Sequence, residues 1–222
     1  MFAACWSVKG GSGTTVVAAS LALVLARADA GALLVDLDGD APAVLGLSEP
    51  PGPGLSDWLA AGGGVPADAL ARLEVAVTDG LALLPRGAGP LGPPARVEVL
   101  AALLASEPRS VVVDCGTRRV AASRSDDDPT EPVVAAADRR LLVTRACYLS
   151  LRRLVAGSTR PTGVVLVSEP GRALQRRDVE DVAGVPVVAE VPHDPAVARA
   201  VDAGMLAARL PRVLDRALGR AG

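Results

Sequence analysis

The chain alternates short runs of Val, Leu and Ala with longer stretches rich in Ala, Leu and Arg. Short runs that are apolar throughout predict buried strands, and the longer stretches predict helices. The predicted strands are Phe2–Val8, Ala32–Asp36, Leu81–Pro85, Ser110–Asp114, Leu141–Thr144, Gly163–Val167 and Val187–Val191. The predicted helices are Thr15–Ala28, Leu55–Ala61, Pro66–Arg72, Pro94–Ser106, Leu149–Ala156, Arg176–Val182, Pro195–Ala203 and Met205–Leu218.

Strands without a polar face, separated by helices, indicate a doubly wound α/β fold: a mostly parallel sheet with helices on both faces. A length of 222 residues suits a single domain over residues 1–222. One segment does not follow the alternation. Residues 118–132 contain three arginines and the run Asp126-Asp127-Asp128-Pro129, which predicts a solvated, mobile loop.

Composition narrows the class of protein. Hydrophobic residues make up 50% and aromatic residues only 2%, so the core must be aliphatic. The net charge of −2 argues against a generally cationic nucleic-acid binder, although not against a local basic patch. No apolar run reaches the roughly 18–20 residues that span a bilayer, and we expect a cytoplasmic protein. The three cysteines, Cys5, Cys115 and Cys147, lack the spacing of metal ligands, and we predict that they are buried thiols. His193 is the only histidine.

A glycine-rich segment connects the first predicted strand to the first predicted helix. It reads Lys9-Gly10-Gly11-Ser12-Gly13-Thr14-Thr15, and Lys9 is the only lysine among 23 Lys and Arg residues. Its glycines let the backbone turn tightly and point N–H groups inward, and the helix adds its positive dipole end. A strand before and a helix after favour a phosphate-binding loop over the alternative, a flexible turn.

Carboxylates follow two of the predicted strands. Asp36 and Asp38 lie at the end of the second strand, and Asp114 ends the strand that begins at Ser110. Carboxyl ends of strands line the ligand crevice of a doubly wound sheet, so these acids should converge with the glycine loop. That combination suits Mg²⁺ and nucleotide phosphates, with Thr15 placed to offer a hydroxyl to the metal.

In this order, the motifs resemble the ParA/MinD family of deviant P-loop ATPases. Within it, the chain looks closest to the CpaE/TadZ branch, whose members localise pilus-assembly machinery. The resemblance rests on Lys9-Gly10-Gly11-Ser12-Gly13-Thr14-Thr15, Val35-Asp36-Leu37-Asp38, Val113-Asp114-Cys115-Gly116, Ala137-Asp138, Asp178–Val182, Gly184-Val185-Pro186, Val191–Val197 and Ala203-Gly204.

The resemblance implies a role for each matching position. Lys9 is similar to the signature lysine that reaches the partner's phosphates across a nucleotide-sandwich dimer, and Asp38 to the carboxylate that positions the attacking water. The implied metal ligands for Mg²⁺ are Thr15, Asp38 and Asp114. The implied contacts to ATP or ADP come from Lys9, Gly10, Gly11, Ser12, Gly13, Thr14 and Thr15, with Pro192 and Asp194 closing the adenine pocket.

Three departures from the family pattern bear on function. Thr14 replaces the loop lysine that contacts the β- and γ-phosphates, and Val8 replaces a glycine at the start of the loop. Val167-Ser168-Glu169 stands where the family usually has Asn-Arg, and the acid Glu169 could repel a nucleotide. Because Thr14 lacks the positive charge of the loop lysine, the site loses stabilisation of the transition state of ATP hydrolysis. We therefore expect weak or absent ATP hydrolysis, and whether nucleotide binds stays open.

The resemblance implies a homodimer that acts as a spatial-localisation or assembly factor, with a protein partner from a localisation, secretion or pilus machinery. Two alternatives remain: a catalytically dead scaffold that binds no nucleotide, and an active partition-type ATPase that binds DNA nonspecifically. The second would use Arg139, Arg140, Arg145, Arg152 and Arg153, for which we favour a solvated face.

The C-terminal stretch Leu206–Arg220 has leucines at helical spacing with arginines between them. A membrane-binding amphipathic helix is one reading of this pattern. Pro211 interrupts it and no aromatic residue anchors it, so we predict a final helix packed on the sheet and no stable membrane insertion.

Overall fold

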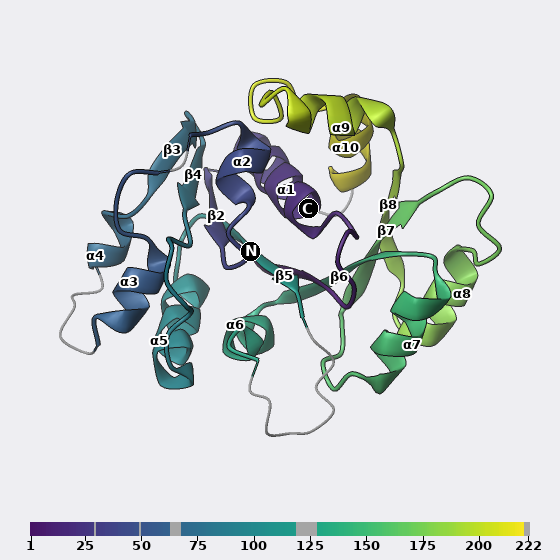
Figure 1. Ribbon diagram of the computed structural model, residues 1–222, viewed down its shortest axis with the longest axis horizontal. Helices are drawn as coiled ribbons and strands as arrows, with labels where there is room; N and C mark the ends of the chain where they lie inside the picture. The colour runs from purple at the N-terminus through teal and green to yellow at the C-terminus, as the bar shows by residue number, and fades with distance from the viewer. Residues whose placement is uncertain (29, 49, 63–67, 119–127, 220–222) are drawn as a thin grey trace.

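The computed structural model describes residues 1–222 apart from 29, 49, 63–67, 119–127 and 220–222. In the described residues, eight strands form one sheet in the order β3-β4-β2-β5-β1-β6-β7-β8 (Figure 1). The strands are β1 Phe2–Ser7, β2 Ala32–Asp36, β3 Val75–Thr78, β4 Leu81–Leu84, β5 Ser110–Thr117, β6 Arg139–Arg145, β7 Gly163–Ser168 and β8 Val187–Pro192.

The sheet is parallel except at one edge, where β3 pairs antiparallel with β4. The central strand β1 lies between β5 and β6, with Ala4 opposite both Val113 and Arg140. Every residue of β1 and β2 is buried, as expected for strands covered on both faces. The doubly wound α/β prediction is confirmed.

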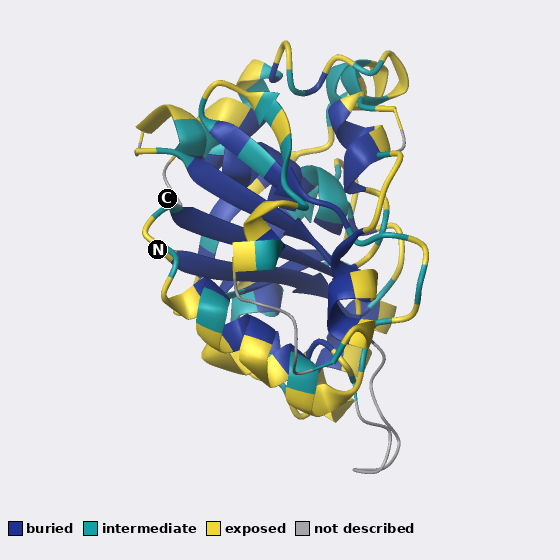
Figure 2. Ribbon diagram, turned by 90° about the vertical axis from the view of Figure 1, so that its left-hand side faces the viewer, coloured by how far each residue is buried: buried dark blue, intermediate teal, exposed yellow. Residues whose placement is uncertain are grey.

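Helices cover both faces of the sheet, and they close two aliphatic cores (Figure 1). One core packs under α1, α2, α9 and α10, and the other under α3, α4, α5, α6, α7 and α8. Figure 2 shows the strands as buried ribbons between helices whose outer surfaces are exposed. The helices are α1 Thr14–Ala28, α2 Ala41–Leu45, α3 Leu55–Ala60, α4 Asp68–Ala71, α5 Pro94–Ala105, α6 Glu131–Ala136, α7 Tyr148–Ala156, α8 Arg176–Ala183, α9 Pro195–Asp202 and α10 Arg212–Leu218.

Three short elements escaped the sequence prediction. The helices α2 and α6 and the strand β3 have only four to six residues each, too few to show a period. The prediction of one helix over Met205–Leu218 was wrong, because α10 begins only at Arg212. Pro211 has no N–H to continue a helix that would start at Met205, and it precedes α10 as its N-cap residue.

The prediction of a solvated loop over 118–132 was wrong at both of its ends. Arg118 is buried and pairs with Asp128 and Glu131, and Glu131 begins α6. Arg118 also stacks over the Trp6 ring, 5.5 Å from its centroid. Residues 119–127, with most of the predicted loop, lie outside the described residues.

The C-terminal helix packs on the sheet, as predicted. Leu214 and Leu218 are buried in the core beneath α1, and Leu210 just before the helix is buried with them. Cys5 and Cys115 are buried as expected, whereas Cys147 is only half-buried. Among the described helices, we find none with the length and apolar character to cross a membrane.

Candidate functional site

The glycine loop folds as a tight turn between β1 and α1. Gly11 and Gly13 have φ values of 73° and 88°, in the left-handed region that side chains other than glycine rarely adopt. The buried Ser12 closes the turn by donating its Oγ hydrogen to the Lys9 carbonyl at 2.7 Å. Arg153 of α7 supports the start of the loop, where its Nη1 donates to the Val8 carbonyl at 3.1 Å. The loop therefore has a defined shape and is not a flexible turn.

The N-terminus of α1 opens into this turn. The Val17 N–H bonds to the Gly13 carbonyl, so the N–H groups ahead of it, in the first turn of α1, have no intrahelical acceptor. These N–H groups and the helix dipole favour a bound anion. Thr14 is buried at the start of the helix, and Lys9 folds back so that its Nζ donates to the Gly10 carbonyl at 3.2 Å.

Asp36 anchors the backbone that follows β2. Its two carboxylate oxygens accept from the N–H groups of Asp38 at 3.0 Å, Gly39 at 2.7 Å and Ala41 at 3.1 Å. Burial raises the pKa of Asp36, and these hydrogen bonds oppose the rise. With both oxygens engaged, Asp36 shapes the loop that carries Asp38, so Asp38 and Asp114 are the two of the three expected acids that are left for a ligand.

Asp114 is the most perturbed acid of the crevice. It is fully buried within β5, three residues before the strand ends at Thr117, and its Oδ1 accepts from the Gly116 N–H at 3.0 Å. Its Oδ2 is buried and has no hydrogen-bond partner among the described residues. Burial raises the pKa of Asp114 to about 7, and the nearby Thr15 hydroxyl and the Gly116 N–H oppose this rise. A buried carboxylate oxygen without a partner, beside a hydroxyl, fits a divalent cation.

Asp38 lies next to Asp114 across Gly116. A Cβ on Gly116 would come within 2.0 Å of the Asp38 Oδ1, and Gly116 has a φ of 60°. Partial burial and the neighbouring Asp40 raise the pKa of Asp38, and Arg86 lowers it. The structure thus brings together Thr15, Asp38 and Asp114, three of the residues that the sequence indicated.

Arg86 is a site residue that the sequence reasoning missed. It follows β4, and its Nη1 donates to the Asp38 carbonyl at 2.8 Å. The available signal was its position just after a predicted strand that runs parallel to β2, at the carboxyl edge of the sheet.

The described residues contain no group of three or more His, Cys, Asp or Glu side chains that could hold a metal ion by themselves. Two carboxylates and a hydroxyl leave several positions for other oxygen ligands. Mg²⁺ takes such mixed sites, where it binds one or two carboxylates together with waters and substrate phosphates. The donor set therefore fits a magnesium ion that arrives with a phosphate ligand.

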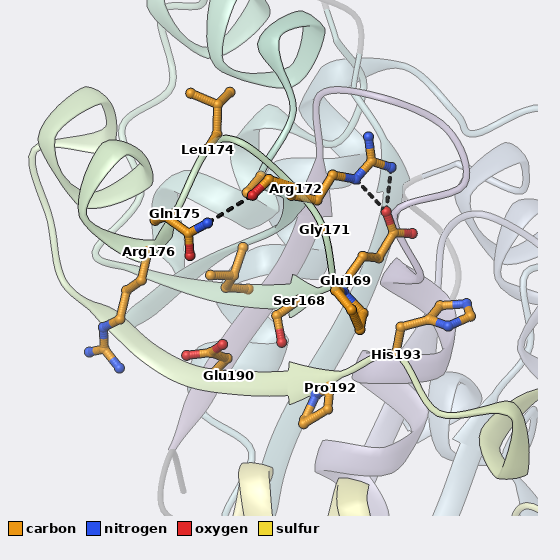
Figure 3. Close-up of a pocket in the computed structure, with 13 residues that line it drawn as sticks. Ser168, Glu169, Gly171, Arg172, Leu174, Gln175, Arg176, Glu190, Pro192 and His193 are labelled. Atoms are coloured by element: carbon orange, nitrogen blue, oxygen red, sulfur yellow. Dashed lines mark hydrogen bonds and ion pairs between the residues drawn. The ribbon is translucent and has the colours of Figure 1, made fainter.

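A cavity of about 340 Å³ lies at the other end of the crevice, between the β7–α8 loop and the edge strand β8 (Figure 3). Glu169 stands at its rim, paired with Arg145 Nη1 at 2.6 Å and Arg172 Nε at 2.6 Å. The hydrogen bonds from Arg172 lower the pKa of Glu169. Its negative charge is therefore compensated within the chain, which weakens the expected repulsion of a nucleotide.

The two residues predicted to close a base pocket differ in position. Pro192 lines this cavity. Asp194 does not, and it accepts from the Ala196 N–H at 2.8 Å as the N-cap of α9. The role of either residue at a nucleotide base stays a prediction.

The arginines considered for DNA binding are spread over the molecule. Arg139 and Arg140 begin β6 and Arg145 ends it, so Arg139 and Arg145 lie about 20 Å apart at opposite ends of the strand. Arg145 is paired with Glu169, and Arg153 with the Val8 carbonyl. This arrangement does not favour a continuous basic patch.

Comparisons with known proteins agree with this geometry. The family model described as the CobQ/CobB/MinD/ParA nucleotide binding domain matches residues 4–207. No curated protein sequence matches the chain significantly.

Solved structures share the fold at low sequence identity. A ParA family ATPase from Chlorobium tepidum has a TM-score of 0.75 and 22% identity, over 98% of this chain and 96% of that one. The septum site-determining protein MinD of Pyrococcus horikoshii, complexed with Mg-ADP, has a TM-score of 0.77 and 21% identity, over 98% and 92%. MinD in a MinC:MinD complex from Aquifex aeolicus has a TM-score of 0.72 and 19% identity, over 99% and 93%.

Proposed function

We propose, because the chain belongs to the CobQ/CobB/MinD/ParA nucleotide-binding domain family, that it binds a magnesium–nucleotide complex and hydrolyses it weakly or not at all. The observation that carries this proposal is the unpartnered Oδ2 of Asp114. This oxygen is buried close to the Thr15 hydroxyl, which follows the glycine loop, and it lies across Gly116 from Asp38. A scaffold with no remaining ligand would gain nothing from such a buried acid.

Each residue of the crevice has a part in binding. The loop from Gly10 to Gly13 and the first turn of α1 would hold the phosphates through backbone N–H groups. Thr15, Asp38 and Asp114 would hold Mg²⁺, which neutralises phosphate charge when bound. The Asp38 carboxylate, held against Gly116, would also orient a water molecule toward the terminal phosphate.

Slow turnover follows from the side chains of the loop. Thr14 is neutral and buried where a loop lysine would serve the β- and γ-phosphates, and Lys9 is the only cation that the loop carries. Without a second fixed positive charge, the loop stabilises less of the charge that develops in phosphoryl transfer. Binding through the backbone is unaffected by this loss.

At a finer level, we propose a homodimer that works as a localisation or assembly factor of the CpaE/TadZ type. Lys9, which is half-buried at the start of the loop, would reach the nucleotide of the second subunit. The family contains MinD, which the Aquifex aeolicus structure records in complex with MinC, so a protein partner is consistent with the family. The partner of this chain would read the dimer as a nucleotide-dependent surface.

Calorimetry with Mg²⁺ and ATP or ADP tests binding, with light scattering on the same samples for the dimer. We expect binding at micromolar to millimolar nucleotide with release of phosphate slower than one per minute. Absence of binding at millimolar nucleotide would establish the dead scaffold instead. Brisk hydrolysis together with a salt-dependent DNA mobility shift would establish the partition-type ATPase.

A further inference from the structure

Positive charge is scarce at one end of the phosphate crevice. The loop supplies Lys9, whose Nζ donates to the Gly10 carbonyl, and Thr14 adds none. Asp38, which follows β2, and Asp114 in β5 are the acids proposed to hold the metal, so a metal-bound terminal phosphate would lie on that side of the loop. A triphosphate needs cations there beyond the metal, because its charge is concentrated at that end.

Close approaches join the proposed metal acids to one arginine. Gly116, two residues after Asp114, lies so close to the Asp38 carboxylate that a Cβ on it would come within 2.0 Å of Asp38 Oδ1. The Asp38 carbonyl in turn accepts from Arg86 Nη1 at 2.8 Å. Arg86 is therefore the cation that contacts the Asp38 loop, on the side where the terminal phosphate would lie.

The Arg86 charge already acts on the Asp38 carboxylate, because it lowers the pKa of that group. The Nε of Arg86 is buried without a hydrogen-bond partner among the described residues, so a ligand would meet the guanidinium at its Nη groups. Its backbone is fixed, because the Arg86 carbonyl accepts from the Ser56 N–H at 2.8 Å. Asp36 holds the N–H groups of the Asp38 loop and Arg86 holds a carbonyl of it, so the guanidinium stands at a defined place beside the metal acids.

Other nearby arginines are committed elsewhere. Arg118 is buried against Asp128 and Glu131. Arg153 supports the start of the loop at Val8, on the side of α7. Neither contacts the Asp38 loop in the described structure.

We propose that Arg86 supplies the positive charge for the terminal phosphate of a bound nucleoside triphosphate and so makes the site prefer a triphosphate to a diphosphate. The proposal rests on the nucleotide binding proposed above. In this role the Arg86 charge acts on the ligand, and its Nη1 also donates to the Asp38 carbonyl.

The test is calorimetry with Mg²⁺ on the full chain, comparing ADP with an ATP analogue that carries an imido bridge before the terminal phosphate. We expect Arg86→Gln to weaken the analogue about fivefold to tenfold and ADP less than twofold. The control is Arg27→Gln, which removes one arginine charge from an exposed pair with Asp215 at the far end of α1. It should leave both affinities unchanged.

Arg86→Lys separates charge from loop support. If Arg86→Gln does not fold, the wild-type ratio carries the test, because a wild type that binds ADP as tightly as the analogue would overturn the proposed preference. A lysine keeps the charge without the guanidinium geometry. We expect its analogue-to-ADP affinity ratio to stay within twofold of the wild type. An equal loss for both nucleotides in Arg86→Gln, or a lost ratio in Arg86→Lys, would overturn the role of Arg86 while nucleotide binding stands. No binding of either nucleotide by the wild type would refute both proposals.

Discussion

Replacing Asp114 with asparagine should stabilise the folded protein, increasingly as the pH rises. Burial raises the pKa of Asp114 from 3.8 to about 7 in the folded chain. Between these values the folded state holds a proton that the unfolded state has lost, so stability falls as pH rises through this window. Asparagine removes the titration. It retains an oxygen that can accept from the Gly116 N–H, as Asp114 Oδ1 does at 3.0 Å.

The magnitude follows from the two pKa values. At roughly 1.4 kcal/mol per pH unit, the buried acid costs the wild type about 2 kcal/mol at pH 5 and about 4 kcal/mol at pH 8. The gain in unfolding free energy of Asp114→Asn over the wild type should therefore widen by about 2 to 3 kcal/mol between these conditions. Any packing penalty from the new N–H₂ group is the same at both pH values and cancels in this difference.

Urea unfolding at pH 5 and pH 8, in EDTA, measures the two free energies. Thr15→Val is the matched variant of opposite sign, because it removes a hydroxyl whose hydrogen bond lowers the Asp114 pKa. It should lose more stability at pH 8 than at pH 5. A gain for Asp114→Asn that does not change with pH would refute the reasoning that Asp114 is a buried, unpaired acid.

Three further predictions concern the same crevice and its surroundings. Gly116→Ala places a Cβ within 2.0 Å of Asp38 Oδ1 and should displace that carboxylate, with at least a tenfold loss of Mg²⁺-dependent nucleotide affinity; unchanged affinity by calorimetry would show that Asp38 is not a ligand. Thr14→Lys restores a cation to the loop and should raise phosphate release at least tenfold; release unchanged in a variant that still binds ATP would remove Thr14 as the cause of slow turnover. Arg118→Met leaves Asp128 and Glu131 without their buried partner and should lower the unfolding free energy by about 3 kcal/mol. Urea unfolding measures that loss, and a change below about 0.5 kcal/mol would place the pair among solvent-exposed ones.

The fold was accessible from the sequence because its main signals are local. Short β-branched runs such as Val111–Val113 favour strands buried on both faces, and glycines between a strand and a helix predict an anion-binding turn. The elements that were missed, such as β3 and α6, are short enough that the packing around them decides their form. The helix predicted over Met205–Leu218 begins only at Arg212 for a local reason, because the missing N–H of Pro211 outweighs the helical spacing of the leucines.

The state of each acid depended on the tertiary structure. Asp36 and Asp38 are two residues apart and look equivalent in sequence, yet one is consumed by three backbone N–H groups and the other is held against Gly116. The sequence by itself determined the sheet, the loop and the order in which acids follow strands, because these depend on patterning and turn chemistry. Only the packed structure decided which carboxylate stays unpaired and that Arg86 stands beside Asp38. Burial and hydrogen bonding between residues distant in the chain leave no periodic trace in it.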